Sequence, residues 1–188
     1  VDTVFVARLS QDAMNAVSLA FPLQMLCIAF SVGTGIGMNA LLSRSLGERN
    51  QEGADRAAGT GLFLTLCTAA LFTLIGLAFA GFFFRLQTDN EQIIAYGRDY
   101  VMICIGGSLG IFMQVYGERL LQSTGRTDLS MISQVVGAAI NIVLDPILIF
   151  GLLGFPRLEV AGAAVATVVG QLVGAALGLY LNLTRNPE

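Results

Sequence analysis

The sequence contains no histidine, no lysine and no tryptophan, and it has only three cysteines. Without histidine, a Ser/His/Asp triad and the common zinc sites lack an essential member. The cysteines Cys27, Cys67 and Cys104 all lie in apolar runs and form no Cys-x-x-Cys pair, so we interpret them as small packing residues. The usual hydrolytic, zinc-dependent and thiol redox chemistries are therefore not expected.

Charge is also scarce. Charged residues make up 12% of the chain, the net charge is −3, and the ten basic residues are all arginines scattered singly, which excludes the basic patch of a nucleic-acid partner. In contrast, 55% of the residues are hydrophobic and the mean hydropathy is +0.74, too apolar for a soluble domain of this size. We expect an integral membrane protein whose surroundings are a lipid bilayer.

The chain begins without a methionine and without the basic and apolar segments of a signal peptide. Its opening, VDTVFVARL, is an apolar run of about half the length that a membrane span requires. We expect this run to be the end of a first span whose beginning is missing, and the final TRNPE to be a loop cut short.

Longer apolar runs follow along the chain. We predict an all-α, polytopic membrane helix bundle with five complete transmembrane helices and the end of a first one, in a single domain over residues 1–188. The expected spans are 1–9 (partial), 13–42, 58–84, 93–121, 129–150 and 160–183. The polar residues 43–57 are expected to form a loop with a short amphipathic helix at the membrane surface.

Arginines flank the two sides of this predicted bundle unequally. Because the loops alternate between sides, one side carries Arg8, Arg85, Arg98 and Arg157, and the other carries Arg44, Arg49, Arg56, Arg119, Arg126 and Arg185. The positive-inside rule makes the second side cytoplasmic. The expected location is the cell inner (plasma) membrane, crossed several times.

Glycine patterns predict close helix contacts. GTGIG at residues 33–37 follows no strand and precedes no Lys-Ser/Thr, so it is interpreted as a packing face and not as a phosphate loop. The last span carries small residues at intervals of four, which predicts a continuous ridge for tight contact. These are Gly162, Ala166, Gly170, Gly174 and Gly178.

One expected span contains a carboxylate, in NIVLDPILIFG at residues 141–151. Inserting Asp145 into a bilayer costs at least about 2.5 kcal/mol, so it is a candidate functional residue. Asn141 lies one turn earlier on the same face, and Pro146 cannot bond the carbonyl of Ile142, which weakens the helix there. The group suits a cation or a proton, and the alternative is an aspartate that only ties two helices together.

Other oxygen-bearing side chains are expected at the same depth. At 1.5 Å per residue, Asp2, Asp145 and Thr167 each lie about 9–10 Å below the same face of the membrane. With Asn141 they supply two carboxylates, an amide and a hydroxyl, a set suited to an alkali cation or to a proton shared between coupled acids. Spacing leaves open whether the three helices turn these faces toward each other.

Polar side chains in the remaining spans indicate either a cavity or hydrogen bonds between helices. Those that we assign to a substrate cavity are Gln24, Gln114, Gln134 and Gln171. Glu118 lies four residues after Gln114 and next to Arg119, and we interpret it as half of an interfacial ion pair, with a buried proton carrier as the alternative.

Three stretches of the chain resemble the multidrug and toxic compound extrusion (MATE) family. They are VDTVFVARLSQDAMNAVSLAFP, ALLSRSLGERNQEGADRA and LLQSTGRTDLSMISQVVGAAINIVLDPILIFGLLGFPRLEVAGAAVATVVGQ, which cover nearly the whole chain. The resemblance implies a transporter of twelve helices in two lobes around a central cavity, with this chain as the N-terminal lobe and the C-terminal lobe as a missing partner. It implies export of cationic or amphipathic drugs in exchange for Na⁺ or H⁺ by alternating access, with no cofactor besides that ion.

Residue by residue, the resemblance implies a coupling-ion site. The acidic residue of the family's first helix matches Asp2, and the Asn and Asp of its fifth helix match Asn141 and Asp145. Its sixth-helix contacts match Ala163, through the backbone carbonyl, and Thr167. Members of the family differ between Na⁺ and H⁺ with similar residues, so both ions stay open.

Two alternative functions compete with an antiporter. A lipid-linked saccharide flippase of the same broad superfamily is expected to have a more cationic cavity, whereas few arginines lie within the spans here. An intramembrane enzyme acting on lipids needs clustered acids such as Asp-x-x-Asp, and the sequence has none. We therefore expect a transporter and not an enzyme.

Overall fold

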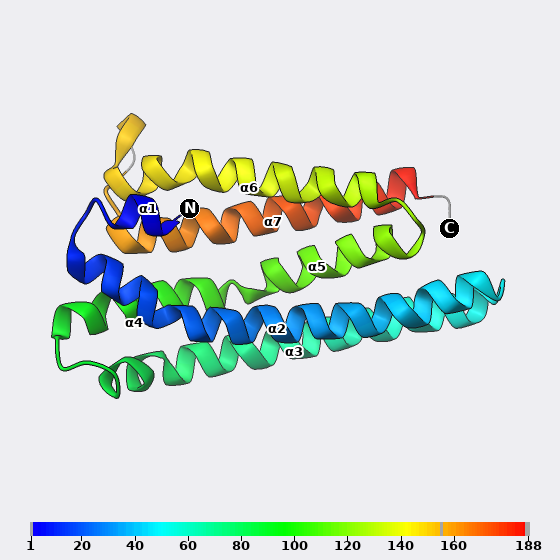
Figure 1. The fold of residues 1–188 in the computed structure, drawn as a ribbon, viewed down its shortest axis with the longest axis horizontal. Helices are drawn as coiled ribbons and strands as arrows, with labels where there is room; N and C mark the ends of the chain where they lie inside the picture. The colour runs from blue at the N-terminus through cyan, green and yellow to red at the C-terminus, as the bar shows by residue number, and fades with distance from the viewer. Residues whose placement is uncertain (1, 155, 187–188) are drawn as a thin grey trace.

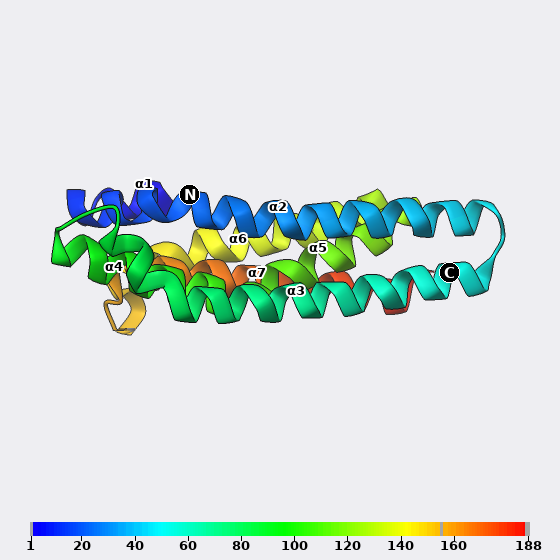
Figure 2. The same cartoon turned by 90° about the horizontal axis from the view of Figure 1, so that it is seen from below.

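The described part of the chain is built from long helices that run up and down one axis (Figures 1 and 2). The computed structural model describes residues 2–154 and 156–186, and of residue 2 the backbone alone. The elements are α1 (Asp2–Val6), α2 (Gln11–Gly47), α3 (Gln51–Arg85), α4 (Glu91–Gly106), α5 (Ser108–Ser123), α6 (Thr127–Phe150), the 3₁₀ helix η1 (Leu152–Gly154) and α7 (Glu159–Arg185). The α2–α3 and α5–α6 turns lie at one end of the bundle, and the α1–α2, α3–α4 and α6–α7 connections lie at the other (Figure 1).

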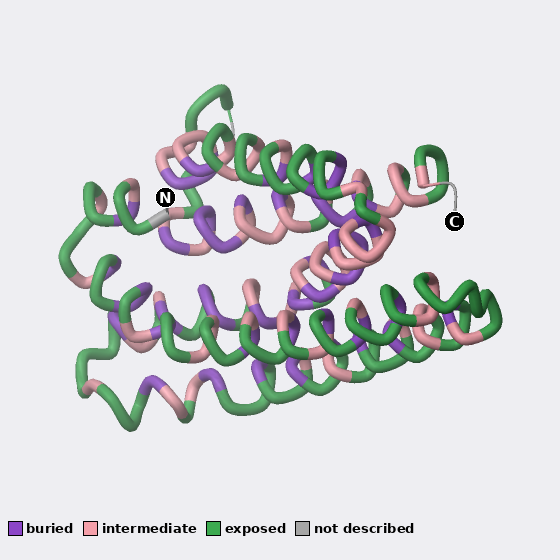
Figure 3. Tube along the Cα trace, turned by 45° about the vertical axis from the view of Figure 1, so that its right-hand side comes forward, coloured by how far each residue is buried: buried purple, intermediate pink, exposed green. Residues whose placement is uncertain are grey.

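Four of these helices, α2, α3, α6 and α7, are long and apolar enough to cross a bilayer, and α4 with α5 makes a fifth if the bent pair is one span. Large apolar side chains such as Phe63, Leu74 and Phe79 are exposed on the outside of the bundle, where lipid accepts them. Buried positions gather on the inward faces of the helices (Figure 3). The prediction of an all-α membrane helix bundle is confirmed.

The break in the bundle lies at a glycine and not at a proline. A proline inside a span often breaks a helix, but Pro22 and Pro146 lie inside α2 and α6, and both helices continue through them. Instead α4 and α5 meet at Gly107 with a bend of 41°. A Cβ on Gly107 would lie 2.6 Å from Cγ1 of Val168, so only glycine allows the bent pair to approach α7 this closely.

The turn between α2 and α3 is shorter than expected, because α2 extends to Gly47 and α3 begins at Gln51. The predicted surface helix within residues 43–57 is therefore wrong. The side chain of Asn50 caps α3 by accepting from the backbone N–H of Gly53 (2.9 Å). Ion pairs one helical turn apart keep the neighbouring polar residues helical. These pairs are Arg44 with Glu48 and Arg56 with Glu52.

The predicted ridge of small residues on α7 is confirmed. All five members are buried, and they bring α7 against α6 and α5. A Cβ on Gly170 would lie 2.7 Å from the carbonyl oxygen of Gly137, and one on Gly162 would lie 2.6 Å from that of Leu148. Backbone therefore lies directly against backbone along the α6–α7 contact.

The predicted packing face at residues 33–37 is wrong for two of its glycines. Gly33 and Gly37 are exposed, and nothing among the described residues lies within 4 Å of a Cβ built on either. Gly35 alone is buried, with Val115 and Arg119 of α5 each 3.0 Å from such a Cβ. Of the three glycines in this motif, only Gly35 packs closely against α5.

We expect Gly170→Ala to lower the melting temperature of the protein in detergent. The added methyl group meets the carbonyl of Gly137, which α6 can relieve only by moving away, at a cost of about 1–3 kcal/mol. Gly47→Ala is the matched control, because a Cβ there meets no described atom within 4 Å. Equal melting temperatures for the two variants would contradict the close α6–α7 contact.

Candidate functional site

The predicted carboxylate in the last third of α6 is fully buried. Asp145 is 0% exposed, and its Oδ1 accepts from Nδ2 of Asn141 at 3.4 Å. The same Nδ2 atom donates to Oγ1 of Thr167 on α7 at 3.3 Å. Both hydrogen bonds are long, and together they bring three of the five predicted site residues into one cluster between two helices.

The two other predicted site residues lie on elements that reach the same end of the bundle. Ala163 is fully buried on α7, one helical turn before Thr167 and on the same face. Asp2 begins α1, and its side chain lies outside the described residues. The helix itself packs against α6 and α7 (Figure 1). Its Val6 is fully buried. The fold thus brings the backbone of α1 to the helices that carry Asp145 and Thr167.

A pocket of about 220 Å³, with several amide side chains in its wall, opens beside this cluster between α5, α6 and α7. Its lining includes three of the four glutamines predicted for a cavity and two residues of the predicted ion site. These are Gln114, Gln134, Gln171, Asn141 and Thr167. We call this cavity the amide pocket. Residues that the sequence distributes over three helices therefore meet in one place.

Gln24 lies apart from the amide pocket. Its Nε2 donates to the hydroxyl of Tyr100 at 3.0 Å, which joins α2 to α4. It lines a smaller cavity of about 40 Å³, which Thr167 and Gln171 also border. The sequence left open whether such polar side chains line a cavity or form hydrogen bonds between helices, and Gln24 does both.

Glu118 does not form the predicted interfacial ion pair. It is 6% exposed, its Oε1 accepts from Nε2 of Gln114 (3.0 Å), and its Oε2 accepts from Nε2 of Gln134 on α6 (2.7 Å). No described ion pair joins it to Arg119, whose guanidinium donates to Gln122. Glu118 and Arg119 are adjacent on the helix and therefore point in different directions. Gln114 and Glu118 are four residues apart and lie on the same face, so the spacing indicated the partner that is observed.

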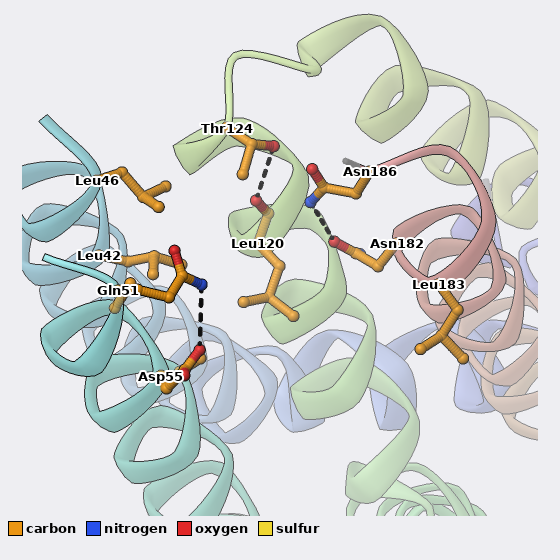
Figure 4. A pocket seen from close by; sticks show the side chains of 11 residues that line it. Leu42, Leu46, Gln51, Asp55, Leu120, Thr124, Asn182, Leu183 and Asn186 are labelled. Atoms are coloured by element: carbon orange, nitrogen blue, oxygen red, sulfur yellow. Dashed lines mark hydrogen bonds between the residues drawn. The ribbon is translucent and has the colours of Figure 1, made fainter. Parts of the chain in front are cut away.

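A second cavity of about 220 Å³ lies at the opposite end of the bundle, where the α2–α3 turn meets the ends of α5 and α7 (Figure 4). Gln51 donates to Asp55 within α3, whereas Asn182 of α7 donates both to the carbonyl of Gly178 on its own helix (2.8 Å) and to that of Gly117 on α5 (2.9 Å). Leu42, Leu46 and Leu183 supply much of the remaining wall. None of the predicted site residues lines this cavity.

Among the described residues, no three His, Cys, Asp or Glu side chains group closely enough to hold a metal ion. A hard cation at Asp145 would therefore also need neutral oxygens, from amide, hydroxyl and backbone carbonyl groups. Asn141, Thr167 and Ala163 are of those types and lie on the two helices that enclose Asp145.

A bundle of membrane-spanning helices with buried carboxyl groups beside a pocket that carries amide side chains is typical of a multi-pass membrane transporter. Residues 1–147 match the family model MatE. The chain belongs to this family, the MATE transporters, and is therefore a multi-pass protein of the inner membrane and not an enzyme.

Known relatives support this assignment over almost the whole chain. The chain is 34% identical to a FAD transporter of Shewanella oneidensis over 185 residues (98% of this chain and 41% of the relative). It is 32% identical to the probable multidrug resistance protein YoeA of Bacillus subtilis (95% and 39%). A solved inward-facing MATE transporter of the MOP superfamily superposes with a TM-score of 0.92 at 30% identity (98% and 41%). The chain thus spans less than half the length of these relatives.

We expect Asn141→Leu to lower the melting temperature more than Thr167→Val. Leucine removes the donor to both Asp145 and Thr167, whereas valine removes one acceptor and leaves the bond to Asp145, so the losses should differ by about 1 kcal/mol. Ser43→Ala removes an exposed hydrogen bond to Asn39 and serves as the control. A smaller loss for Asn141→Leu than for Thr167→Val would contradict the observed bonding.

Proposed function

We propose that this chain is one lobe of a secondary antiporter that exports cationic or amphipathic compounds in exchange for Na⁺ or H⁺. The coupling ion binds at Asp2, Asn141, Asp145, Ala163 and Thr167. The observation that carries the proposal is the complete burial of Asp145 within a membrane-spanning helix. A carboxylate at that depth is costly, and neutralisation by a bound cation or proton removes the cost.

The second lobe of the antiporter is proposed to come from the same protein. The chain spans 41% and 39% of two relatives, one of which is named a probable multidrug resistance protein. The described walls of the amide pocket come from α5, α6 and α7, and a second lobe facing them would complete a central cavity. Transport is expected only from the two-lobed protein.

The chemistry of the amide pocket favours a cationic cargo over an anionic one. One relative is named a FAD transporter, and FAD carries phosphate groups. None of the described residues that line the pocket is basic, and the carboxyl groups of Asp145 and Glu118 lie behind its amides. An anion would therefore be repelled where a cation is attracted.

In the proposed cycle, ion uptake changes the hydrogen bonding between α6 and α7. Asp145 accepts from Asn141 while it is ionised, and the same amide reaches Thr167. Protonating Asp145, or placing Na⁺ against it, removes its demand for that donor. Asn141 can then rearrange, and α1, which packs on the same two helices, responds to the change.

We expect Asp145→Asn to reduce ion-driven efflux to background in the two-lobed transporter, because asparagine can neither hold a proton nor balance a cation. The measurement is efflux of a fluorescent cationic dye from vesicles under a Na⁺ gradient or a pH gradient, imposed separately. The gradient that drives efflux in the wild-type protein names the ion. Asp2→Asn is expected to behave in the same way.

Asp128→Asn is the matched control, since Asp128 lies on the same helix but is exposed and pairs with Arg126. Unchanged efflux for Asp145→Asn at normal expression would overturn its role. If neither gradient moves dye and Asp145→Asn matches the wild type, drug antiport is wrong, and lipid-linked saccharides become the substrates to test.

A further inference from the structure

The amide pocket is flanked by two buried carboxyl groups, one near each end. On α6, Gln134 and Asn141 are seven residues apart, or about 10 Å along the helix axis. Gln134 bonds to Glu118 at one end, and Asn141 bonds to Asp145 at the other. The proposed ion site lies at the Asp145 end of the pocket and does not involve Glu118, so it assigns no function to the Glu118 end.

The carboxylate of Glu118 determines which side of the amide groups of Gln114 and Gln134 faces the pocket. An ionised carboxylate only accepts hydrogen bonds, so Gln114 and Gln134 must each turn the NH₂ side of the amide toward it, as observed. Their carbonyl oxygens are the atoms left to bond a ligand, and both residues line the pocket. This end of the pocket therefore offers two amide oxygens, from α5 and α6, with a negative charge behind them.

No described cation forms an ion pair with that charge. Arg119 is adjacent in sequence and attracts the carboxylate through space, but its guanidinium donates to Gln122 and not to Glu118. Glu118 is 6% exposed, so water screens its charge poorly. The part of the negative potential that Arg119 does not offset is therefore felt in the pocket beyond the two glutamines.

The arrangement suits a large cation better than a small one. A small hard cation binds by direct contact with several oxygen atoms. Both carboxylate oxygens of Glu118 are already engaged by N–H donors, so direct coordination would break those bonds. An organic cation with a shielded or diffuse charge needs only acceptor oxygens and a negative potential, and the pocket of about 220 Å³ has room for an alkylammonium group.

We propose that the positively charged group of an organic cation binds at the Glu118 end of the amide pocket. Gln114 and Gln134 contact the cation, and Glu118 is the positioning residue that orients both amides and supplies the attracting charge. This inference rests on the proposed function, because it assigns recognition of the cargo to the same lobe. It separates the cargo subsite from the ion site at Asp145.

The test is binding to the two-lobed transporter in nanodiscs, with no gradient, of two dansyl probes that differ only in charge. One probe ends in a trimethylammonium group and the other in its neutral isostere, a tert-butyl group. We expect Glu118→Gln to raise the Kd of the cationic probe about tenfold and to change that of the neutral probe less than about twofold. Glu48→Gln, which removes an exposed charge paired with Arg44, should change neither.

A second variant separates charge selectivity from folding. Gln134→Met keeps the length of the side chain but removes the contacting oxygen. Like Glu118→Gln, it is expected to weaken binding of the cationic probe more than binding of the neutral probe. A merely structural role for Glu118 would weaken both probes equally. Equal weakening, or unchanged affinities in Glu118→Gln, overturns the proposal.

The two proposals fail in different ways. Loss of efflux in Asp145→Asn together with unchanged probe selectivity in Glu118→Gln overturns the cargo subsite alone. Retained efflux in Asp145→Asn together with lost selectivity in Glu118→Gln overturns the coupling site alone. Because probe binding needs no gradient, neither result depends on the other.

Discussion

The contact on which this lobe depends is the backbone-to-backbone approach of α6 and α7 at Gly137 and Gly170. A Cβ on Gly170 would lie 2.7 Å from the carbonyl oxygen of Gly137 and 3.2 Å from Cβ of Asn141. The short amide of Asn141 can therefore reach Thr167 across the interface at 3.3 Å. Helix packing and the candidate ion site are one arrangement, because larger residues on the ridge would move the two polar side chains apart.

The same constraint explains how two carboxyl groups persist among apolar helices. The bilayer supplies no water, so each buried carboxylate needs donors from the protein itself. Asn141 donates to Oδ1 of Asp145, and two glutamines donate to the two carboxylate oxygens of Glu118, so that three side-chain amides bond to the two acids. Each amide also lines the pocket and can respond to whatever enters it.

Periodicity within a helix made part of this structure predictable, and contacts between helices made the rest unpredictable. The ridge on α7 and the pair Asn141 and Asp145 both follow from spacings of four residues. The partnership of Glu118 with Gln134, sixteen residues away, depends on how the α5–α6 turn folds back. The bend at Gly107 likewise depends on Val168 of another helix, whereas α2 and α6 continue through their internal prolines, Pro22 and Pro146.

One consequence follows from α6 being a single unbroken helix from Thr127 to Phe150. Gln134 and Asn141 project from the same rod, so a rotation of α6 that displaces one displaces the other by a similar angle. The two ends of the pocket then cannot be adjusted separately. By thermodynamic linkage, if a ligand at one end of the pocket changes the affinity of the other end by some factor, a ligand at the other end changes the affinity of the first by the same factor. The proposed cargo and ion sites would then be coupled through α6.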